Sequence, residues 1–126
     1  MERVGTGRYL ARNAAGVELE LGSGAMSPVE LLLAALAGCA AADVDVETSR
    51  HAEPESFEVT VEADKLTEGG NRLADVQVTF HVTFGEGAGA DAARAILPRA
   101  LRVSHESSCT VSRTVEAATP VRMRLA

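Results

Sequence analysis

Three features of the sequence predict an α+β fold: two pairs of segments in which polar and apolar residues alternate, a long apolar helix between the pairs, and an amphipathic helix after them. Alternation with a period of two is typical of strands that bury one face. The apolar helix carries more hydrophobic surface than one such sheet covers. The 126 residues are expected to form one domain, residues 1–126, in the order β-β-α-β-β-α-α-β.

The two strand pairs are predicted to be hairpins. The first spans residues 7–13 and 16–21, and the polar segment ending in Gly16 supplies its turn. The second spans residues 57–63 and 76–84, where valines and phenylalanines alternate with polar residues. Two glycines followed by asparagine lie between these strands, which favours antiparallel pairing.

The central helix is predicted over residues 27–46. Ser27 is suited to cap it, Pro28 to its first position, and Glu30 to the reciprocal bond of a capping box. Residues 31–42 carry no charged side chain, so the helix is expected to be buried on all sides. Charged residues bound this run, and it is shorter than the roughly 20 apolar residues that a membrane span needs.

The remaining elements are a helix, a short helix and a strand. The apolar spacing over residues 91–103 predicts a helix, which Pro98 is expected to kink or break. A tight loop around Cys109 leads into a short helix that ends near Ala118. Residues 121–125 alternate apolar residues with arginines, which predicts a terminal strand whose arginines pair with glutamates of the other strands.

Charge and composition exclude several classes of function. The net charge is −6 and aromatic residues make up 3% of the chain, which disfavours binding to nucleic acid or to an anionic membrane surface. The first seven residues contain no apolar signal region, and this predicts a cytoplasmic protein. Two cysteines without paired histidines are too few for a zinc site, and no cofactor is expected.

The two thiols, Cys39 and Cys109, are 70 positions apart and are poor candidates for a structural disulfide in a reducing compartment. They are either reactive or inert and buried, and buried free cysteine is the commoner case. His105, four residues before Cys109, could lower the pKa of that thiol or bind a metal with it. A metal would need further ligands that the sequence does not offer.

The chain resembles the OsmC/Ohr family of osmotically induced and organic-hydroperoxide-resistance proteins. The resemblance rests on the helix that opens with Pro28 and runs through alanines and leucines to Cys39, on the motif Cys109-Thr-Val-Ser, and on the strand order. It implies an OsmC-like fold with antiparallel sheets packed around a buried central helix in an intertwined homodimer. An all-apolar helix in a small domain independently favours a dimer.

The resemblance also implies chemistry. Cys39 would be the thiolate that reduces an organic hydroperoxide, and Cys109 would resolve the resulting sulfenic acid as a disulfide, which a cellular dithiol then reduces. Peroxidases of the family activate the thiol with an arginine of the N-terminal hairpin, held by a glutamate directly after the proline. Here Val29 occupies that place and Glu30 follows it, so Glu30 is a candidate that its capping position also explains.

The hairpin offers Arg8 and Arg12 as the activating arginine, and Arg12 is favoured because it lies at the turn. The sequence therefore leads to two hypotheses. The first is a thiol-dependent peroxidase acting on organic or lipid hydroperoxides. The alternative is a non-enzymatic OsmC-like dimer that binds an apolar small molecule at the subunit interface, with both cysteines as packing residues.

Overall fold

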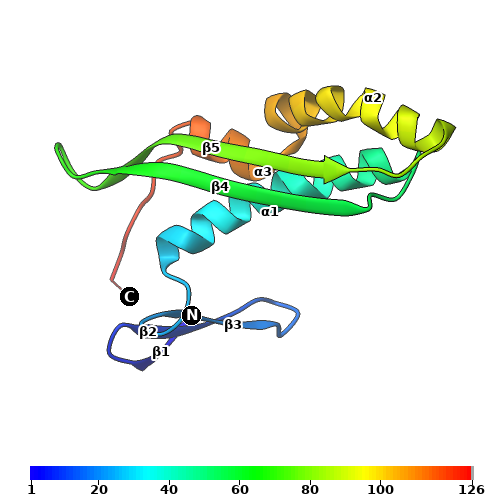
Figure 1. The fold of residues 1–126 in the computed structure, drawn as a ribbon. Helices are drawn as coiled ribbons and strands as arrows, with labels where there is room; N and C mark the ends of the chain where they lie inside the picture. Colours follow the sequence, from blue (N-terminus) through cyan, green and yellow to red (C-terminus); the bar gives the residue numbers. More distant parts are fainter. Residues whose placement is uncertain (126) are drawn as a thin grey trace. The chain divides into compact units, whose positions relative to one another are not determined.

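A computed structural model describes residues 1–125 of the chain. Its elements are, in order, β1 (Glu2–Gly5), β2 (Arg8–Arg12), β3 (Glu18–Gly22), α1 (Pro28–Ser49), β4 (Ser56–Leu66), β5 (Arg72–Thr83), α2 (Ala88–Val103), the π-helix η1 (Ser104–Ser108) and α3 (Thr110–Glu116) (Figure 1). The chain divides into two compact units with the boundary after Ala34. The prediction of mixed helices and antiparallel strands is confirmed, whereas the predicted order is changed at both ends.

The N-terminal unit contains a three-stranded antiparallel sheet in the order β1-β2-β3. The predicted hairpin is the β2–β3 pair, in which Tyr9 lies opposite Leu21. Strand β1 was not predicted, because its four residues are nearly all exposed and show no alternation of burial. Gly22 ends β3 with a φ of 103°, and a Cβ there would lie 2.0 Å from the Gly7 carbonyl oxygen, so only glycine fits this position.

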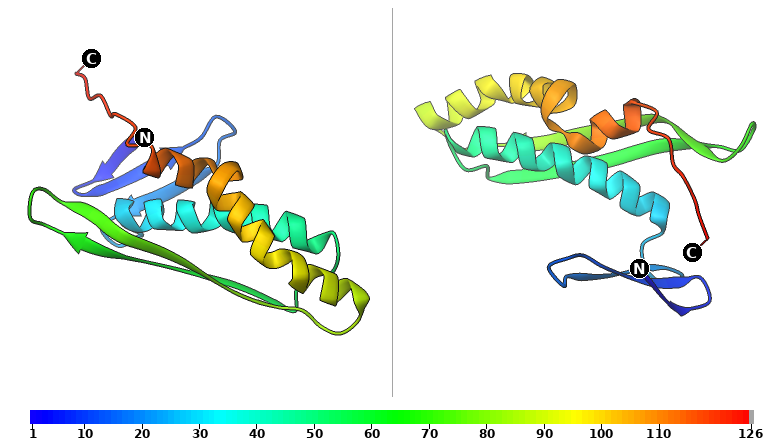
Figure 2. Two further views of the ribbon diagram at one scale, coloured as in Figure 1. Left: turned by 90° about the horizontal axis from the view of Figure 1, so that it is seen from above. Right: turned by 180° about the vertical axis from the view of Figure 1, so that it is seen from behind.

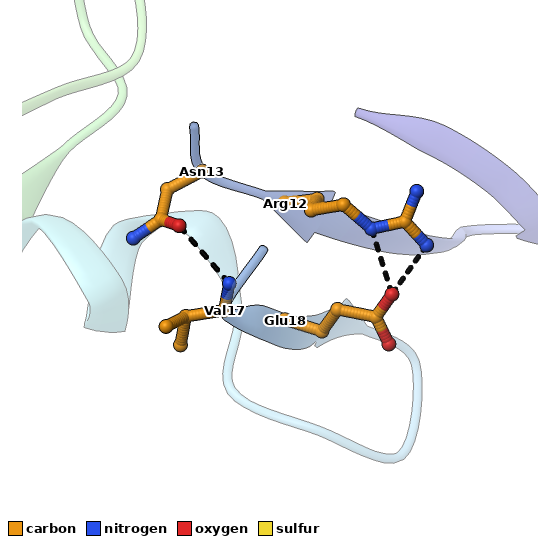
Figure 3. A network of polar contacts seen from close by, with 4 residues as sticks. All are labelled: Arg12, Asn13, Val17 and Glu18. Carbon is orange, nitrogen blue, oxygen red and sulfur yellow. Dashed lines mark hydrogen bonds and ion pairs between the residues drawn. The ribbon is translucent and has the colours of Figure 1, made fainter. Parts of the chain in front are cut away.

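Side chains stabilise the turn between β2 and β3 (Figure 3). The Asn13 side-chain oxygen accepts hydrogen bonds from the backbone N–H groups of Ala15, at 2.9 Å, and Val17, at 3.0 Å. On the strands beside the turn, the Arg12 Nε atom donates to Glu18 at 2.8 Å. Arg8 makes a corresponding ion pair with Glu20. The prediction that arginines of the C-terminal segment pair with these glutamates is therefore wrong, since closer partners lie across the hairpin.

The capping box that opens α1 is formed as predicted. Ser27 N–H donates to the Glu30 carboxylate at 2.7 Å, and Glu30 N–H donates to the Ser27 hydroxyl oxygen at 3.2 Å. The pKa of Glu30 is lowered, and the largest cause is the hydrogen bond that its carboxylate accepts from the Ser27 backbone N–H. The helix continues to Ser49, three residues beyond the predicted end, because the hydroxyl of the fully buried Thr48 bonds back to the Val44 carbonyl at 2.9 Å.

Burial of α1 on all sides is not achieved within one chain. Only Ala37, Val44 and Thr48 of this helix are buried, while Val46 is 58% exposed. In the second unit, the elements that follow α1 along the chain cover one side of this helix and leave its other side uncovered. One chain alone therefore does not bury the central helix, and the second subunit that the sequence analysis expects to complete its burial stays a prediction.

The second unit is built on the long antiparallel hairpin β4–β5, which confirms the second predicted strand pair. Phe57 lies opposite Val82 and Val59 opposite Phe80, with a bulge between Glu62 and Asp64. Helices α2 and α3 and the part of α1 in this unit lie on one face of the hairpin (Figure 2). A small core cluster of Phe84, Ala90 and Ala93 joins the end of β5 to the first turns of α2.

The C-terminal third departs from the sequence prediction in two places. Helix α2 runs without a break through Pro98, because the buried Ala93 and Ala100, on either side of the proline, keep the helix packed. Residues 121–125 do not form the predicted strand, and the side chains of Val121, Met123 and Leu125 are 80 to 101% exposed. A strand needs hydrogen bonds to a neighbouring strand, and residues 121–125 pair with none of the strands described over residues 1–125.

None of the helices described over residues 1–125 combines the length and apolar character that a membrane crossing requires.

Candidate functional site

The two cysteines come from different elements of the second unit. Cys39 lies on α1 and is partly exposed, whereas Cys109 is completely buried, with 0% of its surface exposed. Cys109 follows the π-helix η1 and is the N-cap residue of α3, so its sulfur occupies the place that a cap oxygen usually fills. Neither cysteine forms a disulfide in this structure.

Ser112 holds the Cys109 sulfur with two hydrogen bonds. The Ser112 hydroxyl donates to Sγ over 3.1 Å and the Ser112 backbone N–H over 3.4 Å. The Cys109 backbone N–H in turn donates to the Ser104 carbonyl at 2.8 Å. Both serines are buried, at 8% and 2% exposure, so water does not compete for these bonds. The position of the Cys109 sulfur is therefore fixed from both sides.

The two thiols meet. The two thiols lie close enough to shift each other's pKa, and the backbone N–H of Val111 acts on the pKa of both. Because the two thiols influence each other, they lose their protons in steps that belong to the pair rather than to either sulfur alone. The structure thus brings together the two thiols that the sequence placed 70 positions apart.

The pKa of Cys109 is lowered from the ordinary thiol value. Burial alone would raise it, but the Ser112 hydroxyl, the Ser112 N–H, the Cys39 thiol and the Val111 N–H together outweigh that effect. Each of these donors favours the charged form of the sulfur. Of the two thiols, Cys109 is therefore the one that loses its proton more readily.

The pKa of Cys39 is raised. Its largest single influence, the Val111 N–H, acts to lower it, but the Cys109 sulfur, burial and the Asp43 carboxylate together act more strongly in the other direction. A second negative charge beside an existing one is costly. The order of the two pKa values differs from what the predicted roles suggest, since the thiol assigned to attack peroxide is the one whose pKa is raised.

Replacing Ser112 by alanine is expected to raise the pKa of Cys109, because the substitution removes the shorter of the two serine hydrogen bonds that stabilise the thiolate. The Cys39→Ala background isolates the titration of Cys109, which is followed by the ultraviolet absorbance of the thiolate against pH. Ser112→Thr keeps the hydroxyl and should restore the original titration. Ser107→Ala, which removes a hydroxyl bonded to the Val103 carbonyl, is the matched control. An unchanged titration in Ser112→Ala would contradict this account.

An apolar cavity of about 680 Å³ lies between the elements that carry the two thiols, although neither cysteine lines it. Its wall contains Ser112, the partner of Cys109, and Ala40, the neighbour of Cys39. The other lining residues come from α1, β5, α2, η1 and α3 and are mostly apolar: Leu36, Val76, Val78, Thr79, Phe80, Leu101, Ser104, His105, Val115 and Glu116. Its volume and apolar lining suit an organic molecule of moderate size.

Three other residues singled out from the sequence have local partners. Arg12 binds Glu18 on the neighbouring strand, and Glu30 belongs to the capping box with Ser27. Arg12 and Cys39 lie in separate units, so their predicted interaction stays a prediction. His105 pairs with Glu116 at 2.8 Å rather than with Cys109. Among residues 1–125, no group of three or more histidine, cysteine or acidic side chains is placed to hold a metal ion.

Sequence reasoning missed Ser112, Asp43 and the Val111 N–H as parts of the site. The sequence contains two spacings that could have identified the side chains of Asp43 and Ser112. Asp43 follows Cys39 by one helical turn and therefore shares its face of α1. Ser112 stands three residues after Cys109, the spacing at which a cap residue and the third helical residue bond each other.

Comparisons with solved structures support the fold. A hypothetical protein from Aquifex aeolicus is 19% identical, with a TM-score of 0.76 over 94% of this chain and 85% of that one. A structure described only as "structural genomics" is 26% identical, with a TM-score of 0.69 over 93% and 87% of the two chains. An OsmC-like protein of unknown function from Vibrio cholerae is 17% identical, with a TM-score of 0.59 over 87% and 79%.

No match was found among curated proteins. The model of the family described as OsmC-like protein matches residues 21–124, a stretch that contains both cysteines, the central helix and the second hairpin. This match covers most of the sequence, and the resemblance noted from the helix and the two cysteine motifs is thereby confirmed. The chain belongs to the OsmC-like family.

Proposed function

We propose that the protein is a thiol-dependent peroxidase that reduces organic or lipid hydroperoxides, with Cys39 as the attacking thiol and Cys109 as the resolving thiol. The observation that supports this most is the proximity of the two thiols, each of which shifts the pKa of the other. Two thiols packed only for their bulk need no such contact and no cluster of donors around one of them. The partial exposure of Cys39 admits a peroxide, whereas the complete burial of Cys109 does not.

The raised pKa of Cys39 is compatible with attack if Cys109 takes its proton. In this mechanism the Cys39 sulfur attacks the terminal peroxide oxygen, its proton passes to the Cys109 thiolate, and the O–O bond breaks. The leaving alkoxide takes up that proton and departs as an alcohol. Cys39 is left as a sulfenic acid and Cys109 is again a thiolate, so the charge of the pair is unchanged.

Resolution follows from the same geometry. The Cys109 thiolate attacks the sulfur of the Cys39 sulfenic acid, a disulfide forms, and hydroxide leaves and takes a proton to become water. An external dithiol then reduces the disulfide and is itself oxidised to a disulfide. The Val111 N–H, which acts on the pKa of both thiols, can stabilise charge on either sulfur during these steps. Arg12 remains the proposed activating cation, and Glu30 the proposed residue that would hold it.

The test of this function is stopped-flow oxidation of the reduced protein by cumene hydroperoxide, with the Cys39→Ser variant as comparison. Rapid loss of thiol, one alcohol formed per disulfide and dependence on Cys39 are the expected results. The cavity of about 680 Å³ supports preference for a bulky peroxide, so hydrogen peroxide should react more slowly. Thiols that survive an excess of cumene hydroperoxide would contradict the proposal.

A homodimer is part of the proposal. The apolar side chains Val46, Val103 and Val115 in the second unit are 40 to 58% exposed, and the C-terminal Val121, Met123 and Leu125 are exposed still further. A second copy of the chain would cover such surface. Sedimentation equilibrium is expected to give twice the mass of the 13.1 kDa chain, and a monomer at micromolar concentration would contradict this part.

The cavity also favours a second candidate function, the binding of an apolar small molecule without catalysis. In that case both cysteines are packing residues near the binding site, and their thiols react slowly. Native mass spectrometry would then detect a retained lipid-like ligand on a protein whose thiols are inert to peroxide. Fast oxidation of Cys39 would exclude this candidate.

A further inference from the structure

A chain of two hydrogen bonds links the helix of Cys39 to the backbone of Cys109. Asp43, one turn beyond Cys39 on α1, accepts a hydrogen bond from the Ser104 hydroxyl at 2.8 Å. Ser104 is only 2% exposed, and its carbonyl accepts the Cys109 N–H, also at 2.8 Å. The Asp43–Ser104 bond joins residues 61 positions apart and crosses between α1 and the first residue of the π-helix.

The bond from Cys109 N–H to the Ser104 carbonyl has the i to i+5 spacing of a π-turn, and η1 consists of this single widened turn. Such turns are rare, and they persist where the surroundings hold them. Relaxation to an α-helical turn would shift the chain by one residue, about 100° of helical rotation. That rotation would carry the Cys109 side chain away from α1. Something must therefore hold Ser104 in place, and the Asp43 carboxylate is bonded to its side chain.

We propose that Asp43, acting through Ser104, is a positioning residue that keeps Cys109 in register for disulfide formation with Cys39. The inference rests on the dithiol of the proposed function but not on its substrate.

Asp43 has a second effect through its charge. Beside the stronger influences of the Val111 N–H, the Cys109 sulfur and burial, its carboxylate contributes to the raised pKa of Cys39. On the elements that follow, His105 and Glu116 are hydrogen-bonded to each other.

Equilibration with glutathione tests the register without any peroxide. Oxidised glutathione is attacked by the Cys39 thiolate, which forms a mixed disulfide and releases one glutathione thiolate. The Cys109 thiolate then attacks the Cys39 sulfur, forms the protein disulfide and releases the second glutathione. The protein dithiol loses two electrons and two protons, and two molecules of reduced glutathione are formed. The position of this equilibrium measures how well the two sulfurs are held for bonding.

Asp43→Ala and Ser104→Ala are each expected to shift this equilibrium toward the dithiol by about tenfold, the effect of losing one buried hydrogen bond. Asp43→Asn keeps an acceptor oxygen for the Ser104 hydroxyl and should stay within about twofold of the wild type. Asp45→Asn is the matched control, because Asp45 is an exposed residue of the same helix whose carboxylate bonds only Ser49 locally.

The charge effect has a separate readout. In the Cys109→Ser background, Asp43→Asn is expected to increase the rate of Cys39 alkylation by iodoacetamide near neutral pH by about threefold, since a nearby negative charge is removed. The pH profile of alkylation should shift to lower pH. Asp45→Asn should change neither. If Asp43 had only a structural role, Asp43→Asn would leave the pH profile of Cys39 alkylation unchanged in the Cys109→Ser background.

The outcomes are distinguishable. A glutathione equilibrium that is unchanged in both alanine variants would overturn the positioning role. If one of the two alanine variants loses its native circular dichroism, the positioning role is judged from the other variant alone. Each variant removes the same Asp43–Ser104 hydrogen bond, one by deleting the acceptor and the other by deleting the donor. A disulfide that never forms in the wild type would overturn the inference and the resolving role together. A wild type that forms the disulfide but ignores cumene hydroperoxide would overturn the proposed peroxidase alone.

Discussion

Replacing Cys39 by serine is expected to lower the second-order rate constant for cumene hydroperoxide by at least about a thousandfold, because a hydroxyl is a far weaker nucleophile than a thiolate. The remaining thiol, Cys109, has no exposed surface and lies behind the donors of Ser112. It cannot replace Cys39 without movement of α3 or η1. The rate is measured by stopped-flow thiol titration and by the amount of cumyl alcohol formed.

The control for this experiment is Cys109→Ser, which leaves the accessible sulfur in place. First-turnover oxidation should persist in that protein and disappear in Cys39→Ser. The reverse result, fast reaction at Cys109 in the absence of Cys39, would show that the sulfur with the lower pKa is also the one that attacks, and would exchange the two proposed roles.

Replacing Cys109 by serine is expected to convert a reversible cycle into irreversible inactivation. Without a partner sulfur, the sulfenic acid on Cys39 persists and excess peroxide carries it to sulfinic and sulfonic acids. Mass spectrometry should detect the addition of two and then three oxygen atoms at Cys39, and no intramolecular disulfide. A disulfide-free wild type with the same oxidation products would contradict a resolving role for Cys109.

The same variant tests the coupling of the two thiols. The Val111 N–H is expected to remain near Cys39, while the hydrogen-bonding and charge effects of the Cys109 sulfur, both of which raise the pKa of Cys39, are removed. The pKa of Cys39 should therefore fall, and its alkylation profile should move to lower pH. In Cys39→Ala the opposite shift is expected for Cys109, which loses one of the donors that lower its pKa. Independent thiols would show neither shift.

The sequence was sufficient for elements whose causes are local. Ser27 and Glu30 form the predicted capping box because the spacing of three residues alone decides that geometry. Both hairpins follow from alternation and turn residues that lie within a few positions of each other. The prediction for residues 121–125 was wrong because alternation describes a strand's faces and not the neighbouring edge that it needs.

The candidate site could be predicted only in part. Family resemblance suggested that Cys39 and Cys109 act together, but the order of their pKa values depends on donors from α3 and on Asp43. The spacing of Asp43 from Cys39 and of Ser112 from Cys109 is local, but the influence of each thiol on the other arises only when α1 and α3 pack against each other, and single-sequence patterns do not contain that information. The π-turn at Ser104 was also unpredictable, since its residues have no composition that distinguishes them from an ordinary helix end.

The π-helix has a mechanical consequence for redox chemistry. A disulfide requires its two sulfurs to approach to about 2.05 Å, well inside hydrogen-bonding separation, so one element must move. Helix α1 is 22 residues long and stiff along its axis, whereas η1 is one widened turn whose residues 105–108 are all exposed. In the proposed disulfide, a small unwinding of this turn would absorb the approach of Cys109. The oxidised and reduced protein would then differ in the surface of this turn, which would give a reductant a shape by which to recognise the oxidised form.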